Sequence, residues 1–405
     1  MFKYKNTKYK LDIVFPNKSY GGVYSLGPLI IQNIVNKRDN WHCERIFSDQ
    51  GKVTSELVGF TLQWELDLQK AIDMKGNGIN FAGGPLASMN PKLIGQYFDF
   101  LILGDVEAVL PFVLTEYERG EKFLENISNI EGVYVPGKNE PRFKLIKNLD
   151  DAPYPIIQPF PEIVTKDFVF GKTFILEIER GCTNKCNYCP LPNFYSKCKF
   201  RSLENLKQII DEGLSINHVE KVIIYAPSFI HPKRKEILQY LINKDVIVTI
   251  PSIRAETMDK ETMELIKKCG QESLTLAPEC GESLRLKINK NVKDISYFKF
   301  IDLANETGFK KLKLYMQIGL PDMTDKDLEE WINLVKEIQK KFKGKLNISV
   351  NYFVPKPTTT FQDHIFDKKE LKKQANYLKK HLKIEFKLPS LSTSYKEWKI
   401  SKEGI

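Results

Sequence analysis

The sequence predicts an α/β fold in which a Rossmann-like parallel sheet is followed by a partial (β/α)6 barrel. Two series of short apolar runs support this prediction, because the runs in each series alternate with amphipathic stretches suited to crossover helices. A proline-rich stretch at residues 151–155 separates the two series and is typical of an extended linker. The length of 405 residues allows two or three compact domains.

The first series predicts strands at residues 10–15, 42–47, 57–61, 78–82 and 98–103. The loops that follow several of these strands contain glycines and polar side chains. In an open parallel sheet, ligands bind beyond the carboxyl ends of the strands, where glycine lets the backbone approach closely. The candidate binding residues in these loops are Asn17, Gln63, Trp64, Gly83, Gly84, Gly104, Asp105 and Glu107.

The second series predicts the barrel strands. They are expected at residues 173–179, 221–225, 246–251, 272–276, 311–318 and 347–353. Strands at this spacing suit a barrel of about six units, short of the full eight, with its chemistry where strands end and loops begin.

The domain boundaries follow from these two series. We expect a first domain over residues 1–130 and a linker over residues 131–165 that contains a small hairpin at residues 132–135. The barrel is then expected over residues 166–365. Residues 366–405 should form one helix and a tail, irregular from residue 388 onward.

Composition places the chain among ordinary globular proteins, because 42% of its residues are hydrophobic and 28% are charged. It contains no apolar run of the roughly 18 residues that a membrane span requires, and its start lacks the apolar core of a secretory signal. We therefore expect a cytoplasmic protein. The net charge of +10 could attract RNA, an anionic cofactor or an acidic protein, although the lysine-rich stretches are more typical of solvated helix faces.

Three of the seven cysteines lie close together, directly after the first predicted barrel strand: Cys182, Cys186 and Cys189. Three thiolates on one loop can hold three irons of a [4Fe-4S] cluster and leave the fourth iron open. An open iron can bind the amino and carboxylate groups of S-adenosylmethionine. The alternatives are inert buried thiols or a zinc site with Cys198 as its fourth ligand, but no histidine lies nearby.

At these residues the chain resembles the radical S-adenosylmethionine superfamily, whose signature is C-x3-C-x-aromatic-C, with Tyr188 as the aromatic residue. The segments 274–281, 288–290, 313–321 and 353–357 are similar to the subgroup that carries an N-terminal cobalamin-binding domain. The segments 59–66 and 82–85 are similar to that subgroup too, so the resemblance covers nearly the whole chain.

The resemblance implies an iron-sulfur enzyme that cleaves S-adenosylmethionine reductively to a 5′-deoxyadenosyl radical. It also implies cobalamin as a cofactor, methyl transfer to an unactivated carbon, and an electron donor such as ferredoxin or flavodoxin. The candidate contacts of S-adenosylmethionine are Tyr188, Ser252, Arg254 and Glu279. Arg254 suits a carboxylate because its planar donors bind in bidentate fashion, but an ion pair with Glu256 or Glu279 is an equal alternative.

The chain departs from the family patterns in two ways. The Asp-x-His-x-x-Gly loop that supplies a lower axial histidine in many cobalamin proteins is missing, and His42 is the only histidine in the first 150 residues. A bound corrin should therefore lack a histidine below cobalt. Methylthiotransferase-like members carry three more cysteines in the first domain, whereas this chain has only Cys43 there.

Several candidates in the first domain also have a plain structural interpretation. Trp64 could stack on the corrin or pack in the core. Asp105 and Glu107 could contact corrin amides or cap the helix that follows.

Three functions remain open at this point. The first is a cobalamin-dependent radical methyltransferase, and the second is a radical enzyme that catalyses cyclisation, rearrangement or oxidation. The third is a non-catalytic module whose cluster and basic surface bind RNA or a protein. The loops that would choose the substrate carry no recognisable motif.

Overall fold

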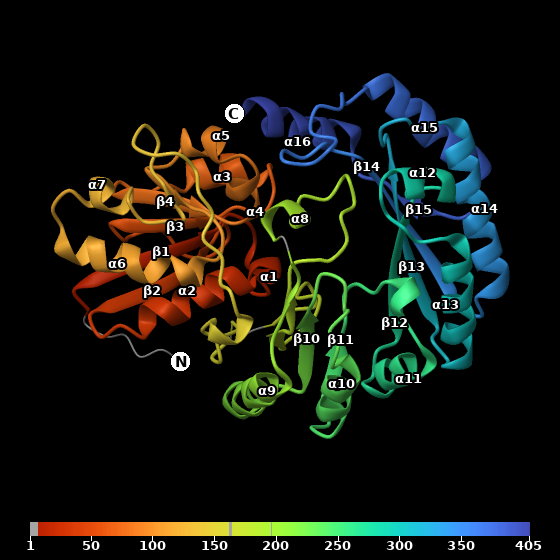
Figure 1. The fold of residues 1–405 in the computed structure, drawn as a ribbon, viewed down its shortest axis with the longest axis horizontal. Helices are drawn as coiled ribbons and strands as arrows, with labels where there is room; N and C mark the ends of the chain where they lie inside the picture. Colours follow the sequence, from red (N-terminus) through yellow and green to blue (C-terminus); the bar gives the residue numbers. More distant parts are fainter. Residues whose placement is uncertain (1–6, 162–163, 196) are drawn as a thin grey trace. The chain divides into compact units, whose positions relative to one another are not determined.

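The computed structural model describes residues 7–161, 164–195 and 197–405. The chain divides into two compact units (Figure 1). The first unit holds residues up to Ile175 together with Asp211–His218 and Lys399–Ile405. The second unit holds Leu176–Ile210 and Val219–Trp398.

The first unit is built on a six-stranded sheet with the order β2-β1-β3-β4-β5-β6. Its strands are β1 (Tyr9–Phe15), β2 (Trp41–Phe47), β3 (Leu57–Thr61), β4 (Ile79–Gly83), β5 (Phe100–Ile102) and β6 (Val133–Tyr134). The first five strands pair in parallel, which confirms the predicted Rossmann-like sheet. All five residues of β3 are buried, as expected for a central strand covered on both faces.

Short helices lie between these strands in sequence and after the last of them. They are α1 (Ser19–Gly22), α2 (Leu26–Asn36), α3 (Asp67–Asp73), α4 (Pro85–Met89), α5 (Pro91–Gly95), α6 (Leu110–Arg119) and α7 (Phe123–Ile127), with single 3-10 turns η1 (Val106–Ala108) and η2 (Leu149–Asp151). Asp12 on β1 is buried and accepts hydrogen bonds from Thr54 N at 2.7 Å and Ser55 N at 2.9 Å, which fixes the chain just before β3.

The small hairpin expected at residues 132–135 does not form. β6 instead pairs antiparallel with β5, with Leu101 opposite Tyr134 and Ile102 opposite Val133. An isolated two-stranded hairpin is marginally stable, and adding the strand to an existing sheet edge satisfies its backbone groups.

The second unit contains the barrel strands. They are β7 (Phe174–Glu177), which begins in the first unit, β10 (Lys221–Tyr225), β11 (Ile247–Thr249), β12 (Ser273–Glu279), β13 (Lys311–Ile318), β14 (Lys345–Tyr352) and β15 (Phe386–Lys387). A further pair, β8 (Glu179–Arg180) and β9 (Lys199–Phe200), is antiparallel. The six predicted barrel strands are therefore present, and the partial barrel is confirmed.

The barrel wall is split into two hydrogen-bonded sheets, with the orders β11-β10-β7 and β12-β13-β14-β15. The buried side chain of Gln271 stands at the break between them. Its Oε1 accepts from Ile250 N at 2.8 Å and its Nε2 donates to Ile250 O at 3.3 Å. One side-chain amide therefore satisfies backbone groups that a neighbouring strand would otherwise pair.

Helices lie between the barrel strands in sequence and after the last of them. They are α8 (Leu191–Phe194), α9 (Leu203–Asn217), α10 (Arg234–Ile242), α11 (Lys260–Lys268), α12 (Glu282–Lys287), α13 (Asp294–Glu306), α14 (Asp325–Lys341), α15 (Lys368–His381) and α16 (Leu391–Glu403), with the 3-10 turn η3 (Ala255–Thr257). In Figure 1, α13 and α14 lie along one face of the sheet that contains β12 and β13.

The tail from residue 388 was expected to be irregular, but it contains the helix α16. Its first turn holds Ser392 and Thr393, which are weak helix formers. Two of its buried positions, Ser394 and Ser401, are polar, so the apolar periodicity that marks a helix is faint in the sequence.

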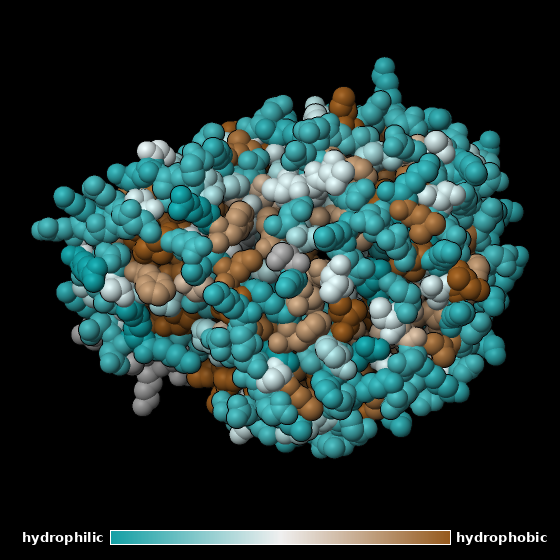
Figure 2. Space-filling view, in the orientation of Figure 1, coloured by the Kyte–Doolittle hydropathy of each residue, from teal (hydrophilic) through white to brown (hydrophobic). Residues whose placement is uncertain are grey.

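Polar side chains dominate the surface. Figure 2 shows hydrophilic residues over most of the visible face, with hydrophobic residues in separate small patches. Of the helices in the described part of the chain, none has the length and apolar character needed to cross a membrane.

Arg285 on α12 holds the turn that follows β12. Its side chain is fully buried and donates to Pro278 O at 2.9 Å, Cys280 O at 2.7 Å and Val292 O at 2.9 Å. It also forms an ion pair with Asp294 at 2.8 Å. One guanidinium therefore satisfies carbonyl groups on both sides of α12.

We predict that Arg285→Leu lowers the free energy of unfolding by about 3 kcal/mol or more, because it leaves buried carbonyls and a carboxylate without their donor. Urea unfolding of the apo chain, followed by circular dichroism, measures this change. The matched control is Lys287→Met on the exposed side of the same helix, which should shift the value by less than about 0.5 kcal/mol. Equal effects of the two substitutions would contradict this account of the turn.

Candidate functional site

The three clustered cysteines line one cavity of about 190 Å³ in the second unit. The cavity lies where barrel strands end, as predicted. It receives Ser228 from the loop after β10, Arg254 from the loop after β11 and Glu279 from the end of β12. The remaining lining residues that concern the chemistry are Asn184, Tyr188, Ser252, Glu256, Lys290 and Tyr297.

The loop that carries the cysteines begins at Gly181, which has a φ of +90°. A Cβ at this position would lie 2.7 Å from Lys197 O, so the close approach of these two backbone segments requires glycine. The loop is tied to the segment after α12 because Asn187 N donates to Ile288 O at 3.0 Å and Asn289 Nδ2 donates to Lys185 O at 2.7 Å.

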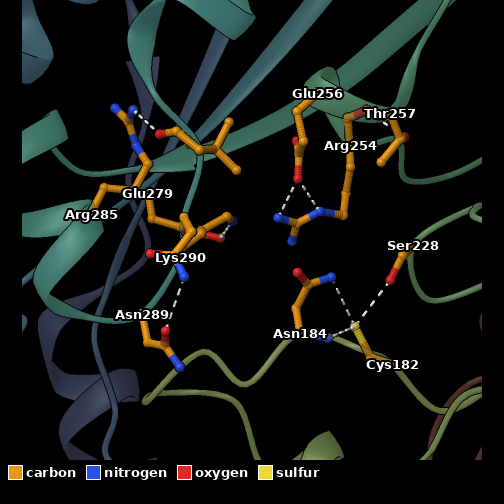
Figure 3. A network of polar contacts seen from close by, with 12 residues as sticks. Cys182, Asn184, Ser228, Arg254, Glu256, Thr257, Glu279, Arg285, Asn289 and Lys290 are labelled. Atoms are coloured by element: carbon orange, nitrogen blue, oxygen red, sulfur yellow. Dashed lines mark hydrogen bonds and ion pairs between the residues drawn. The ribbon is translucent and has the colours of Figure 1, made fainter.

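Two polar side chains contact the sulfur of Cys182. Asn184 approaches it with its backbone N at 3.4 Å and its Nδ2 at 3.5 Å, and Ser228 Oγ lies 3.1 Å away. Figure 3 shows Asn184 and Ser228 on either side of this sulfur. Hydrogen-bond donors of this kind stabilise a thiolate and tune a cluster ligand.

Burial governs the other two thiols. It raises the pKa of Cys189 to about 11 and the pKa of Cys186 above its ordinary value. Both thiols are therefore protonated near neutral pH without metal, and ligation to iron must release their protons.

The arrangement fits a three-thiolate cluster better than a zinc ion. Cys198, the fourth ligand of the zinc alternative, does not line the cavity. A cluster separates its ligating sulfurs by its own iron-sulfur edges, so three thiols spread around one cavity suit it.

A buried carboxylate organises the opposite wall of the cavity. Glu279 Oε1 accepts from Lys290 Nζ at 2.9 Å and from Tyr188 OH at 3.1 Å, and its Oε2 accepts from Gln317 Nε2 at 3.0 Å. The Lys290 ammonium also lies 3.2 Å from Tyr188 OH. Burial raises the pKa of Tyr188 well above its usual value, which keeps the phenol protonated as a donor.

The backbone of Glu279 is strained, with a φ of +68° in a region that favours glycine. This conformation ends β12 and turns the carboxylate toward the cavity (Figure 3). Strained residues of this kind persist where surrounding contacts fix them, and they concentrate at functional sites.

The Arg254 side chain forms an ion pair with Glu256, and its Nε donates to Glu256 Oε1 at 2.6 Å. Of the two ion pairs considered from the sequence, the structure contains the one with Glu256. Arg254 and Ser252 both line the cavity, so the guanidinium is positioned where a ligand carboxylate could also be bound.

Glu179 supports the site by holding the loop that carries Ser228. Its buried carboxylate accepts from Ser228 N at 3.1 Å and Ile230 N at 3.0 Å, which fixes the loop that brings Ser228 to the cluster cysteine. Arg180 forms an ion pair with Glu177, with 2.8 Å between Arg180 Nε and Glu177 Oε1.

In the first unit, three of the predicted loop residues gather around Asp67. Its carboxylate accepts from Gln63 N and Trp64 N, both at 3.1 Å, and from Asn17 Nδ2 at 3.4 Å. The Trp64 side chain is not part of the core, because 60% of its surface is exposed. The loops at the carboxyl ends of β1 and β3 are therefore joined through Asp67 and present an exposed indole.

The predicted glycines of the first unit lie close to other backbone segments. Gly84 has a φ of +96° and Gly104 a φ of +100°, and a Cβ on Gly104 would lie 2.2 Å from Lys144 O. Gly83 ends β4 and its carbonyl accepts from Leu62 N at 2.9 Å. Gly84 and Gly104 are therefore required by their backbone conformation and by contacts within the chain itself.

Asp105 and Glu107 are both buried. Asp105 precedes the turn η1 without capping it, because its Oδ2 accepts from Ile146 N at 2.8 Å instead. The capping interpretation of Asp105 is therefore wrong.

The sequence interpretation missed four residues of these sites as site residues: Asn184, Ser228, Lys290 and Asp67. Lys290 was visible in the family-like segment 288–290, and Ser228 follows a predicted strand, so both carried a positional signal. The roles of Asn184 and Asp67 depend on hydrogen bonds that only the folded chain reveals.

Comparisons with known proteins agree with this geometry. The radical SAM superfamily model matches residues 176–335, and the model for the N-terminal part of radical SAM proteins matches residues 53–136. The relative described as "Uncharacterized protein MJ0966" of Methanocaldococcus jannaschii is 34% identical over 389 residues, which are 92% of this chain and 83% of the relative. The ribosomal protein uS12 methylthiotransferase RimO of Clostridioides difficile is 20% identical over 248 residues, 54% of each chain.

Two solved structures are similar in fold. The radical S-adenosylmethionine methyltransferase TsrM from Kitasatospora setae, with cobalamin and a [4Fe-4S] cluster bound, matches with a TM-score of 0.67 and 13% identity over 87% of this chain and 77% of that chain. The cobalamin-dependent S-adenosylmethionine radical enzyme OxsB matches with a TM-score of 0.62 and 13% identity over 93% of this chain and 56% of that chain. The chain therefore belongs to the radical S-adenosylmethionine superfamily, and its fold is that of cobalamin-dependent members.

Proposed function

We propose that this radical S-adenosylmethionine enzyme is a cobalamin-dependent methyltransferase that acts on an unactivated carbon. The observation that carries the radical chemistry is that the three-cysteine loop shares one cavity with Arg254, Glu279 and Lys290. Together, the cluster, S-adenosylmethionine and cobalamin would supply a 5′-deoxyadenosyl radical and a transferable methyl group.

The residues of the cavity suit the polar end of S-adenosylmethionine. Arg254 and Lys290 are cations that would bind its carboxylate, and Arg254 offers planar donors for this purpose. Glu279 and Ser252 would accept from its amino group or its ribose hydroxyls. Tyr188 would keep Glu279 and Lys290 in place through the hydrogen bonds that already join them.

Cobalamin binding is supported by the first unit. Asn17, Gln63 and Trp64 lie in the loops at the carboxyl ends of β1 and β3, and the exposed indole offers a flat apolar surface for a corrin. Gly83, Gly84 and Gly104 lie at the ends of the neighbouring strands β4 and β5. Asp105 and Glu107 follow Gly104 and are buried, so they would support this edge of the binding site. His42 is the second residue of β2, near the opposite end of the strands, and is paired with Glu44 at 3.4 Å. We therefore expect a corrin without a histidine below cobalt.

A second candidate is a radical enzyme that catalyses cyclisation, rearrangement or oxidation without methyl transfer. The observation in its favour is that the chain itself fills part of the predicted cobalamin edge, because Lys144 packs against Gly104 and Ile146 N bonds to Asp105. Both candidates need an electron donor, for which an acidic ferredoxin or flavodoxin would suit the net charge of +10.

We predict that alanine substitution of Cys182, Cys186 or Cys189 each abolishes cluster assembly, because each variant removes one of only three thiolates. Iron and sulfide content after anaerobic reconstitution measures this. The matched control is Cys198→Ala, which should retain the iron and sulfide of the wild-type chain because Cys198 does not line the cavity. Loss of iron in the Cys198→Ala variant would favour a four-cysteine site.

We predict close to one corrin per chain after anaerobic reconstitution with hydroxocobalamin and removal of free cofactor. Trp64→Ala should reduce the corrin content about tenfold or more, because the exposed indole is lost as a contact surface. His42→Ala should leave both the corrin content and the absorption spectrum unchanged. No bound corrin beside an intact cluster would favour the second candidate.

We predict that product formation by the methyltransferase consumes two molecules of S-adenosylmethionine, one cleaved to 5′-deoxyadenosine and one demethylated to S-adenosylhomocysteine. Quantifying both coproducts by mass spectrometry under reducing conditions tests this. Formation of 5′-deoxyadenosine without S-adenosylhomocysteine would contradict methyl transfer but leave radical chemistry in place.

A further inference from the structure

The inner face of the barrel sheet β12–β14 is polar. On β13, Leu312, Leu314, Met316 and Ile318 are fully buried on the face that packs against the helices, whereas the alternate positions Lys313, Tyr315 and Gln317 are only half-buried. Closed barrels fill their interior with branched apolar side chains, and parallel strands buried on both faces read as continuous apolar runs. On β13, apolar buried residues alternate with polar half-buried residues instead. Its inner face is therefore suited to contact a polar molecule rather than an apolar core.

The neighbouring strands continue this polar face in register. Lys313 stands beside Thr275 of β12 and Asn347 of β14, and Gln317 stands beside Asn351. Tyr315 stands beside Ser349 in the row between them. Side chains at matched positions of parallel strands point to the same side, so these residues form one continuous surface.

This surface adjoins the cavity of the cluster cysteines. Gln317 Nε2 donates to Glu279 at 3.0 Å, and Glu279 and Ala277 both line that cavity. Lys313 lies four residues before Gln317 on β13, which corresponds to about 13 Å along the strand. A molecule that contacts both ends of the surface would therefore reach from Lys313 to the edge of the proposed S-adenosylmethionine site.

Lys313 and Tyr315 form a pair of donors on this surface. Lys313 Nζ donates to Tyr315 OH at 2.6 Å and lies 4.3 Å from the centre of its ring. An ammonium has three N–H groups, of which this bond uses one, and the phenol still has its own O–H to donate. In β12–β15, all of whose residues the structure describes, Glu279 is the only carboxylate, and it is already held by Lys290. The inner face therefore favours an anion.

We propose that the inner face of β12–β14 binds the substrate and that Lys313 and Tyr315 hold an oxyanion group of it, a carboxylate or a phosphate. This inference rests on the proposed function, because it takes the cavity of the cluster cysteines as the reaction site. It assigns a polar, anionic small molecule as the substrate class, with its anionic group about 13 Å from the edge of the proposed S-adenosylmethionine site.

Two probes test the oxyanion site without a known substrate: inorganic phosphate, followed by its phosphorus NMR line width, and carbon-13-labelled acetate, followed by its carbon line width. Both are titrated into the reconstituted full chain at constant ionic strength. We expect saturable binding of at least one probe and a dissociation constant about tenfold or more higher for Lys313→Met, because a charge-assisted donor is lost. Preference for phosphate or for acetate identifies the anionic group of the substrate.

Lys326→Met, on the exposed surface of α14, is the matched control and should bind both probes as the wild-type chain does. Lys313→Arg keeps the charge and should bind within about threefold of wild type, and Tyr315→Phe removes one donor and should bind more weakly. If Lys313→Met does not fold, the weaker binding expected of Tyr315→Phe tests the proposal. Equal affinity of the wild-type chain, Lys313→Met and Tyr315→Phe, or no saturable binding of either probe, would overturn the proposal.

A separate assay of the wild-type chain distinguishes this result from the proposed function. Formation of 5′-deoxyadenosine from S-adenosylmethionine under reduction reports on the radical site alone. Absence of this product with saturable anion binding would overturn the proposed function, whereas its presence without anion binding would overturn only the substrate assignment.

Discussion

The carboxylate of Glu279 is the contact on which the rest of the site depends. It joins three parts of the second unit that are far apart in sequence: Tyr188 on the cluster loop, Lys290 after α12 and Gln317 on β13. An uncompensated buried carboxylate would be costly, and here three donors share that charge. The cluster loop, the segment after α12 and the barrel wall are therefore positioned by a single group, whose own backbone conformation is strained to reach them.

The positions of the strands could be predicted because apolar runs bounded by polar or glycine-rich segments are local signals. The strands Leu57–Thr61, Lys221–Tyr225 and Lys311–Ile318 have the predicted bounds. The break between the two barrel sheets could not be predicted, because the bonds between the Gln271 side chain and the Ile250 backbone that stand there form only in the folded chain. The sequence around a loop glutamine does not indicate which backbone groups its side chain will bond to. The helix α16 was missed for a related reason, since its buried serines hide its inner face.

The residues of the candidate site likewise fall into those with a local sequence signal and those set by tertiary contacts. The cysteine loop was readable because its three thiols lie within eight residues and their spacing is itself the chemical signal. Arg254 and Glu279 were found from their places after strands, and the structure lines the cavity with both. The partner of Arg254, the role of Ser228 and the exposure of Trp64 are tertiary properties. For the same reason a cap was one of the two interpretations of Asp105, although its carboxylate bonds to a residue 41 positions away.

The break in the barrel wall also has a thermodynamic consequence. Ser252 and Arg254 follow the edge strand of one sheet, whereas Glu279 ends the edge strand of the other, and no backbone ladder in the described chain joins the two. A ligand that fills the cavity between them acts as a non-covalent crosslink across this seam. Its binding free energy is then added to the free energy that holds the two edges together, by an amount that grows with the logarithm of ligand concentration. The barrel should therefore be a more cooperative unit when its cavity is filled than when it is empty.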